Sequence, residues 1–146
     1  MKSLPKVTRL QLKVDQDDEH ILLGIVSPEP DYKLSLSLNR RLKLSLKNSS
    51  PLKVSDDKGN DLTFSRFSDT SGAPDISFNL ISNRSGNNFL LKKLKNIDYL
   101  LSVRDPDIAG KINNITASLR EIDSVTAVFN IDISSIKDKN LQDVIQ

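Results

Sequence analysis

Apolar and polar positions near the end of the chain predict a strand, a helix and a second strand. The first strand alternates Ile97, Tyr99, Leu101 and Val103 with Asp98, Leu100, Ser102 and Arg104, which gives it one strongly apolar face. Apolar residues then recur at spacings of four and three, as in an amphipathic helix: Ile108, Ile112, Ile115, Leu119 and Ile122. A second alternation follows: Val125, Ala127, Phe129, Ile131 and Ile133. Together these segments predict a βαβ unit, with a right-handed crossover if both strands share a sheet.

The turn between the first of these strands and the helix carries residues that begin helices. Asp105 suits the N-cap, Pro106 suits the first helical position, and Asp107 complements the helix dipole. Such turns often bind phosphate in α/β proteins. This one has no glycine, its proline lacks a donor, and its carboxylate would repel phosphate. We therefore expect capping groups here, and neither a nucleotide site nor a catalytic carboxylate pair.

The middle of the chain predicts a β-hairpin or meander. Residues 62–67 and 76–80 both alternate, on either side of a loop that contains the turn formers Gly72 and Pro74. Lys58-Gly59-Asn60 predicts another turn, and residues 89–94 predict a short helix.

The first third of the chain leaves two structures open. Residues 10–14 predict a strand, and the apolar run 21–26 is too short to assign by periodicity. Leucines between positions 34 and 46 alternate around Asn39-Arg40-Arg41, as in a hairpin, but that turn lacks the glycine that tight hairpins favour. Leu34, Leu38 and Leu42 are also four apart. We therefore favour a helix from Pro30 to Arg41 and a strand from Leu42, with the hairpin as the alternative.

Composition indicates a single domain, residues 1–146, with an aliphatic core. Hydrophobic residues make up 37% of the chain, charged residues 27% and aromatic residues only 5%. The absence of cysteine fits a reducing compartment. Residues 1–10 hold no apolar run of signal-peptide length, and no stretch approaches the roughly 20 apolar residues of a membrane span. We expect a cytoplasmic protein that does not contact membranes.

Few residues are suited to catalysis or to cofactor binding. The chain has five glycines, one histidine and no cysteine, so we predict no catalytic residues, no cofactor and no metal. The densest cluster of metal-ligand types is Asp15, Asp17, Asp18, Glu19 and His20. A calcium loop of the EF-hand kind needs glycine at its sixth position and glutamate at its twelfth, where this chain has His20 and Val26. The cluster is better interpreted as a solvated acidic turn.

A stretch with basic residues and no acid is the most distinctive charge feature. The net charge is only +2, yet residues 33–53 hold six cations and no carboxylate. We predict a docking patch for an acidic partner protein, made by Lys33, Arg40, Arg41 and Lys43. On a helix, Lys33, Arg40 and Arg41 would share the side opposite Leu34 and Leu38. With Tyr32 as its one aromatic residue, the stretch does not indicate a specific nucleic-acid site. The simpler alternative is a solubilising face.

Several blocks resemble the IPExxxVDY family of small bacterial proteins, found chiefly in Bacteroidota. The resemblance rests on Leu23-Gly24-Ile25-Val26-Ser27, Asp31-Tyr32-Lys33-Leu34, Leu38-Asn39, Leu80-Ile81-Ser82-Asn83 and residues 94–101, in matching order. Ile122 and Val128 match two positions of the naming motif, but Asp123, Ser124, Phe129 and Asn130 replace its other residues. This motif falls on the helix-to-strand corner, where it marks a structural turn. The resemblance implies no activity or site residues, and it favours the helix at 30–41.

The predicted fold class is α+β: a mostly antiparallel sheet with helices on one face and a C-terminal βαβ unit. The leading functional hypothesis is a non-enzymatic protein that binds or scaffolds another macromolecule. The alternatives are a small-ligand regulatory domain of ACT-like type, by fold analogy with the βαβ ending, and an enzyme that uses only carboxylates and lysines. A homo-oligomer suits the first two hypotheses.

Overall fold

A six-stranded antiparallel sheet forms the centre of the molecule, in the order β2-β3-β4-β7-β1-β8. The computed structural model describes residues 19–145. The sheet strands are β1 (His20–Val26), β2 (Lys47–Ser55), β3 (Asp61–Asp69), β4 (Ser77–Ser82), β7 (Tyr99–Arg104) and β8 (Ala127–Ile131). A small hairpin pairs β5 (Arg84–Ser85) with β6 (Asn88–Phe89). The helices are α2 (Asp31–Leu42), α3 (Ile108–Arg120), the short α4 (Leu141–Ile145) and a 3₁₀ turn at Ile133–Ser135.

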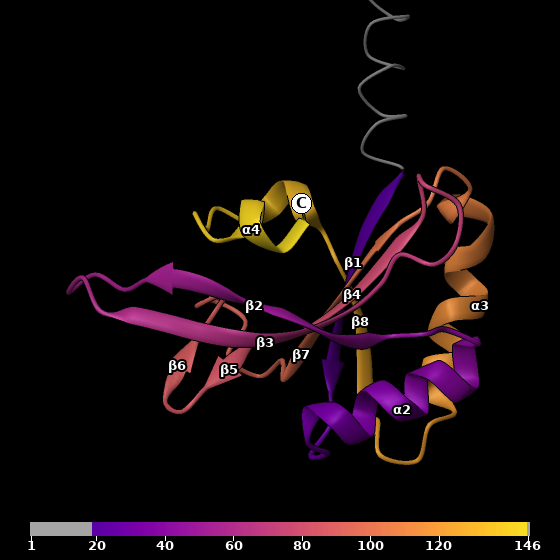
Figure 1. Ribbon diagram of the computed structural model, residues 1–146, viewed down its shortest axis with the longest axis horizontal. Coiled ribbons are helices and arrows are strands. Elements are labelled where there is room, and N and C mark those ends of the chain that lie inside the picture. The colour runs from indigo at the N-terminus through magenta and orange to yellow at the C-terminus, as the bar shows by residue number, and fades with distance from the viewer. Residues whose placement is uncertain (1–18, 146) are drawn as a thin grey trace, which may run out of the picture.

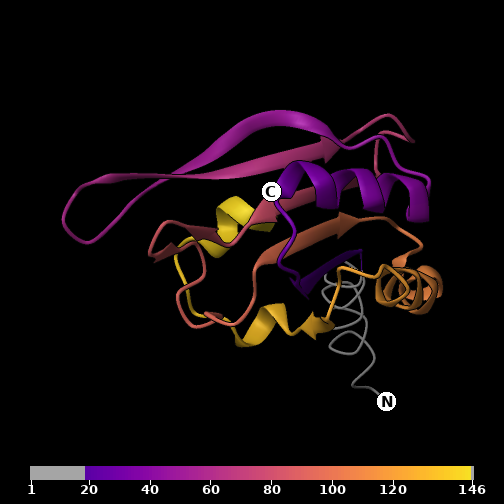
Figure 2. The ribbon, with the colours of Figure 1, turned by 90° about the horizontal axis from the view of Figure 1, so that it is seen from below.

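The predicted α+β class is confirmed, with the two long helices on one face of the sheet (Figures 1 and 2). The C-terminal βαβ unit is also present, because β7 and β8 lie in one sheet and α3 connects them. The two strands are not neighbours. β1 lies between them and is antiparallel to both, with Ile21 opposite Val103 and Leu22 opposite Ile131.

Helix α3 covers the sheet with the predicted stripe. Ile108, Ile115 and Leu119 are buried in the core that it shares with α2, whereas Ile112 is only partly covered. The predicted N-cap is wrong, because the helix begins at Ile108 and its N-cap is Asp107, which makes no capping bond. The Asp105 carboxylate instead accepts the N–H of Asp107 at 2.8 Å and the ammonium group of Lys111 at 2.7 Å.

In β7 and β8, the two strands of the βαβ unit, the buried side chains differ from those that the sequence predicts. β7 is buried on both sides, with Leu100 and Ser102 as well covered as Leu101, because further chain packs on the second face. In β8, Val128 is buried and Phe129 is 47% exposed, the reverse of the prediction. Ala127 lies opposite Val26, yet the N–H of Thr126 also bonds to the Val26 carbonyl, at 2.8 Å. Thr126 and Ala127 therefore share Val26 as their partner. This bulge shifts the alternation of buried and exposed side chains in β8 by one position.

The helical interpretation of the first third is correct, and α2 runs from Asp31 to Leu42. The predicted strand from Leu42 is wrong, since the chain leaves the helix through Lys43, at a φ of 57°, and β2 begins only at Lys47. The Asn39 side chain fixes this connection by bonding to both the N–H and the carbonyl of Leu46, at 2.8 and 3.2 Å.

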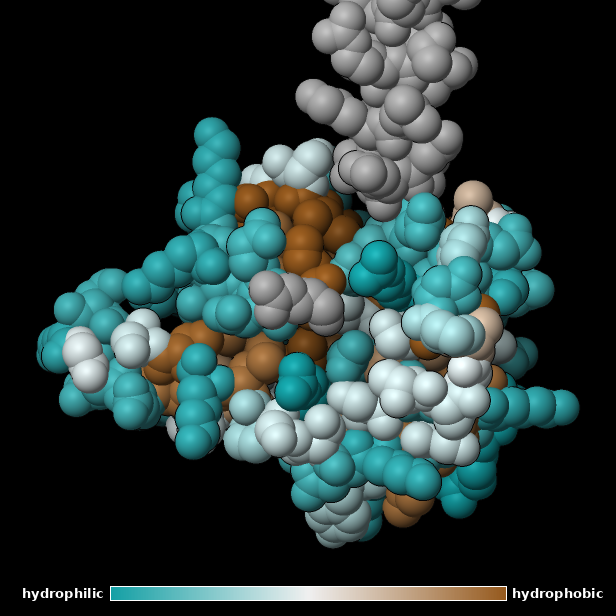
Figure 3. Space-filling model, turned by 45° about the horizontal axis from the view of Figure 1, so that its top comes forward, coloured by the Kyte–Doolittle hydropathy of each residue, from teal (hydrophilic) through white to brown (hydrophobic). Residues whose placement is uncertain are grey.

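The middle hairpin is confirmed as β3 and β4, and the turn at residues 56–60 precedes β3. The short helix predicted at 89–94 is wrong, because Phe89 ends β6 and irregular turns follow. The strand predicted at 10–14 lies outside the described residues. The 83–97 segment and α4 cover the second face, where apolar side chains reach the surface between hydrophilic ones (Figure 3).

Candidate functional site

Asp98 and Tyr99, where β7 begins, hold the loop before helix α2. The N–H of Ser27 donates to the Asp98 carboxylate at 2.9 Å, and the Tyr99 hydroxyl donates to the Glu29 carbonyl at 2.6 Å. Burial, together with the carboxylates of Asp31, Asp98 and Glu29, raises the pKa of Tyr99 to about 12. The hydroxyl therefore stays protonated as a donor, and the loop before α2 is held on the sheet.

Helix α2 buries one side and presents two large apolar side chains on the other. Leu34 and Leu38 are fully buried, whereas Tyr32 is 55% exposed and Leu36 is 54% exposed. These two residues are four apart and therefore adjacent on the helix surface. Lys33 and Arg40 are exposed on the same side, three and four residues from Leu36. We call this surface the α2 docking face: Tyr32, Lys33, Leu36 and Arg40.

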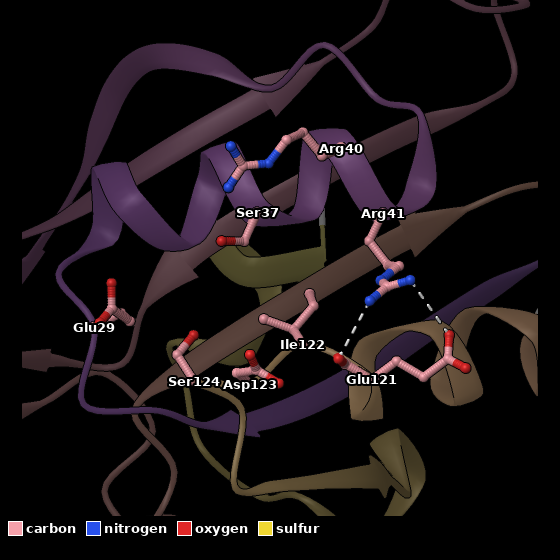
Figure 4. A pocket seen from close by; sticks show the side chains of 8 residues that line it. All are labelled: Glu29, Ser37, Arg40, Arg41, Glu121, Ile122, Asp123 and Ser124. Atoms are coloured by element: carbon pink, nitrogen blue, oxygen red, sulfur yellow. Dashed lines mark hydrogen bonds and ion pairs between the residues drawn. The ribbon is translucent and has the colours of Figure 1, made fainter.

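Arg41 leaves the docking face and turns toward the end of α3. Its guanidinium lies 3.7 Å from the Glu121 carboxylate and donates to the Glu121 carbonyl at 3.3 Å (Figure 4). Both side chains are exposed, so water screens this ion pair and it adds little to stability. The contact orients Arg41 and leaves Lys33 and Arg40 as the cations of the outer side.

An open groove of about 490 Å³ separates α2 from the corner between α3 and β8. Ser37, Arg40 and Arg41 line the helix side, and residues 121–124 line the corner (Figure 4). The carboxylates of Glu29, Glu121 and Asp123 lie along the same groove. The groove is therefore mixed in charge, and the positive character belongs to the outer surface of α2.

The four residues of the predicted docking patch are all exposed, but they do not form one cluster. Lys33 and Arg40 share the outer side of α2, as predicted, while Arg41 lies on its flank. Lys43 follows the helix at its C-cap, beside a shallow groove that also contains Asp105 and Lys111. Binding by this patch stays a prediction.

The predicted acidic cluster lies mostly outside the described residues, which include only its last two members. Within residues 19–145, no group of three or more metal-ligating side chains comes together. The His20 Nε2 lies 2.7 Å from the Ser102 hydroxyl. Burial, and then the charge of Arg104, lowers the pKa of His20. Ser102 is only 3% exposed in the middle of β7, whereas His20 is partly exposed and lines an open groove.

Sequence patterns missed the apolar part of the docking face, although a signal for it was present. Leu36 falls off the stripe formed by Leu34, Leu38 and Leu42, so a helix at this position must expose it. The contact between Arg41 and Glu121 carried no such signal, because the two residues are distant in sequence.

A second groove, of about 580 Å³, lies between residues 91–94 and 135–139. Leu94 and Ile136 contribute apolar surface to it. Its rim is rich in lysine: Lys92, Lys93, Lys137 and Lys139. Lys92 is already paired with Asp57, at 3.4 Å. The small-ligand and enzymatic hypotheses stay predictions.

No described helix has both the length and the apolar character needed to cross a membrane. Comparison of the chain with protein-family models, curated proteins and solved structures finds no match.

Proposed function

We propose that this protein is a non-enzymatic binding protein that docks an acidic partner protein on the α2 docking face. The observation that carries the proposal is the exposure of Tyr32 and Leu36 side by side, next to the two cations Lys33 and Arg40. Contiguous apolar surface with a polar rim is typical of interaction sites. Tyrosine and arginine are also enriched among the residues that dominate binding energy.

The charge of the docking face indicates the chemistry of the partner. Lys33 and Arg40 lie on either side of Leu36 along the helix, so the complementary surface carries apolar residues flanked by carboxylates. Such pairing speeds association and weakens as salt screens it over about 8–10 Å. The partner segment that fits best is an amphipathic helix with leucine or phenylalanine between aspartates or glutamates.

The rigidity of α2 supports this role. The loop before the helix is held by Asp98 and Tyr99, and the connection after it is held by Asn39. A surface that is already ordered loses little conformational entropy when it binds.

The test uses two amphipathic helical peptides with identical leucine positions. In one peptide glutamates flank the leucines, and in the other lysines flank them. Wild-type protein should bind the glutamate peptide, and the affinity should fall with added salt. Lys33→Glu with Arg40→Glu should abolish this binding and create binding to the lysine peptide. Arg41 is left unchanged because it already contacts Glu121.

A control reverses a single cation elsewhere in the basic stretch. Lys53 is exposed on β2, so Lys53→Glu should leave both affinities unchanged. Leu36→Ser should weaken binding without altering the melting midpoint, because Leu36 is already half exposed. Equal binding of the two peptides, or binding of neither, would contradict the proposal.

The cytoplasm is the compartment that we propose for this function, since a chain without cysteine suits a reducing environment. Membership of the IPExxxVDY family is likewise a proposal. It is supported by the way the resembling blocks meet, since Ser27 bonds to Asp98. It is also supported by Asn83, whose side chain bonds to the carbonyls of Leu94 and Ile97.

A further inference from the structure

The two edge strands of the sheet differ in their protection against pairing. Edge strands offer unpaired N–H and C=O groups, and proteins commonly block them with lysine, proline or a bulge. β2 has all three devices: Lys47 and Lys53 are exposed on it, Pro51 lacks an N–H, and its register shifts between Ser49 and Leu52. This edge is unsuited to accepting another strand.

The opposite edge, β8, has none of these devices within its five residues, since the bulge at Thr126 comes before the strand begins. Its sequence from Ala127 to Ile131 is AVFNI, which contains no charge, no proline and no glycine. It keeps a regular register against β1, and within residues 19–145 no strand pairs with its outer side. Phe129, at its centre, is 47% exposed.

One side-chain contact shows which backbone groups face outward. A guanidinium N–H of Arg120 donates to the Val128 carbonyl at 3.5 Å, at the long end of hydrogen-bond distances. The backbone groups of Val128 therefore point away from β1. Backbone direction repeats every second residue in a strand, so those of Asn130 also point outward.

We propose that β8 pairs with β8 of a second copy of this chain, antiparallel, about a two-fold axis at Phe129. Val128 of one copy then exchanges backbone hydrogen bonds with Asn130 of the other, and the two Phe129 side chains face each other. The Phe129 pair lies between these bonded pairs, where strands approach most closely. Facing aromatic residues stabilise such a pair.

A second copy fits this edge because the strand is complementary to itself. In the proposed register Ala127 faces Ile131 and Thr126 faces Asp132, so no like charges oppose each other. Arg120 must leave the Val128 carbonyl, and its long bond from an exposed side chain makes this displacement easy. The inference is independent of the proposed function of α2.

Sedimentation equilibrium over a wide range of protein concentration tests the proposal. Wild-type protein should approach twice the monomer mass as concentration rises. Phe129→Lys brings two cations together at the axis, and Asn130→Pro removes an outward N–H without touching the bonds to β1. Each should weaken the dimer at least about tenfold, which is about 1.4 kcal/mol.

Ser50→Lys adds the same charge to the other edge, at an exposed position, and should leave the dimer intact. Amide exchange supplies a second measurement on the wild type, which does not depend on how well a variant folds. The amides of Val128 and Asn130 should exchange more slowly at high concentration, whereas those of β2 should not change. A monomer mass at every concentration would overturn the proposal, and so would a dimer that persists in both β8 variants.

Discussion

The two faces of the sheet are covered by different kinds of backbone. One face carries α2 and α3, whose buried leucines and isoleucines form a continuous core with the inward side chains of β1 and β7. The other face carries the 83–97 segment, which contains the small hairpin, and the short α4, over a second core that includes Leu22, Phe64 and Leu100. Both cores are almost wholly aliphatic, so the difference lies in how the covering chain satisfies its own polar groups.

Helices meet most of their hydrogen-bonding needs internally, but irregular chain does not. On the second face, two buried asparagines supply hydrogen bonds to the irregular backbone. The Asn83 side chain donates to the carbonyls of Leu94 and Ile97 and accepts the N–H of Leu91. The Asn140 side chain donates to the Leu90 carbonyl at 3.0 Å. The helical face therefore depends on apolar packing, and the irregular face depends also on a few specific polar contacts.

The largest expected effect is on the helical face. Ile115→Asp replaces a buried apolar side chain of the α2–α3 core by a carboxylate, and this should cost several kcal/mol out of a total stability of about 5–15 kcal/mol. We expect the domain to be largely unfolded by circular dichroism. Asn114→Asp introduces the same charge at an exposed neighbour and should leave the melt nearly unchanged. Equal midpoints for the two variants would mean that α3 does not pack on the sheet as described.

A smaller effect is expected on the irregular face. Asn83→Ala leaves one buried N–H and two buried carbonyls without this partner, which should cost about 2–3 kcal/mol in the free energy of unfolding. Urea denaturation measures this cost, and Asn87→Ala, an exposed position in the same loop, is the control. If both variants unfold at the same urea concentration, the Asn83 bonds do not stabilise this face.

The smallest effect is a pH dependence specific to the second face. His20 shares that side of β1 with Leu22, and burial, followed by the charge of Arg104, lowers its pKa in the folded state below the ordinary value of 6.5. The unfolded chain therefore binds more protons than the folded chain, and stability must fall as pH drops below about 6.5. His20→Gln should flatten the profile between about pH 7.5 and 5.5, where carboxylates stay largely ionised. An unchanged slope in His20→Gln would contradict this assignment.

The same contrast explains how much of the fold the sequence predicts. α3 and the β3–β4 hairpin follow from periodic apolar positions, since a regular element facing one core repeats its pattern, whereas the leucine pattern of α2 also fits a hairpin. The 89–94 segment and α4 do not follow from such positions, because their shape depends on Asn83 and Asn140, whose backbone partners lie in loops. In β8, the shift at Thr126 changes the buried residue from Phe129 to Val128, and period-two counting cannot detect such a shift.

Of the candidate site, the sequence predicts only the cations. Lys33 and Arg40 follow from the absence of acids between residues 33 and 53. The exposure of Leu36 depends on α2 being a helix, which the leucine pattern alone leaves open. The contact of Arg41 with Glu121 depends on the α2–α3 packing, and no local pattern encodes it.

The place of β1 between β7 and β8 also affects how the chain folds during synthesis. β1 is the first described strand to leave the ribosome, but its partners β7 and β8 are made last. At about 5–20 residues per second, the wait between β1 and β8 is about 5–20 seconds. During that time Leu22, Leu23 and Ile25, fully buried in the finished fold, have no strand to pair with. The nascent chain therefore presents a short apolar segment of the kind that chaperones bind, and the sheet closes only once β8 has emerged.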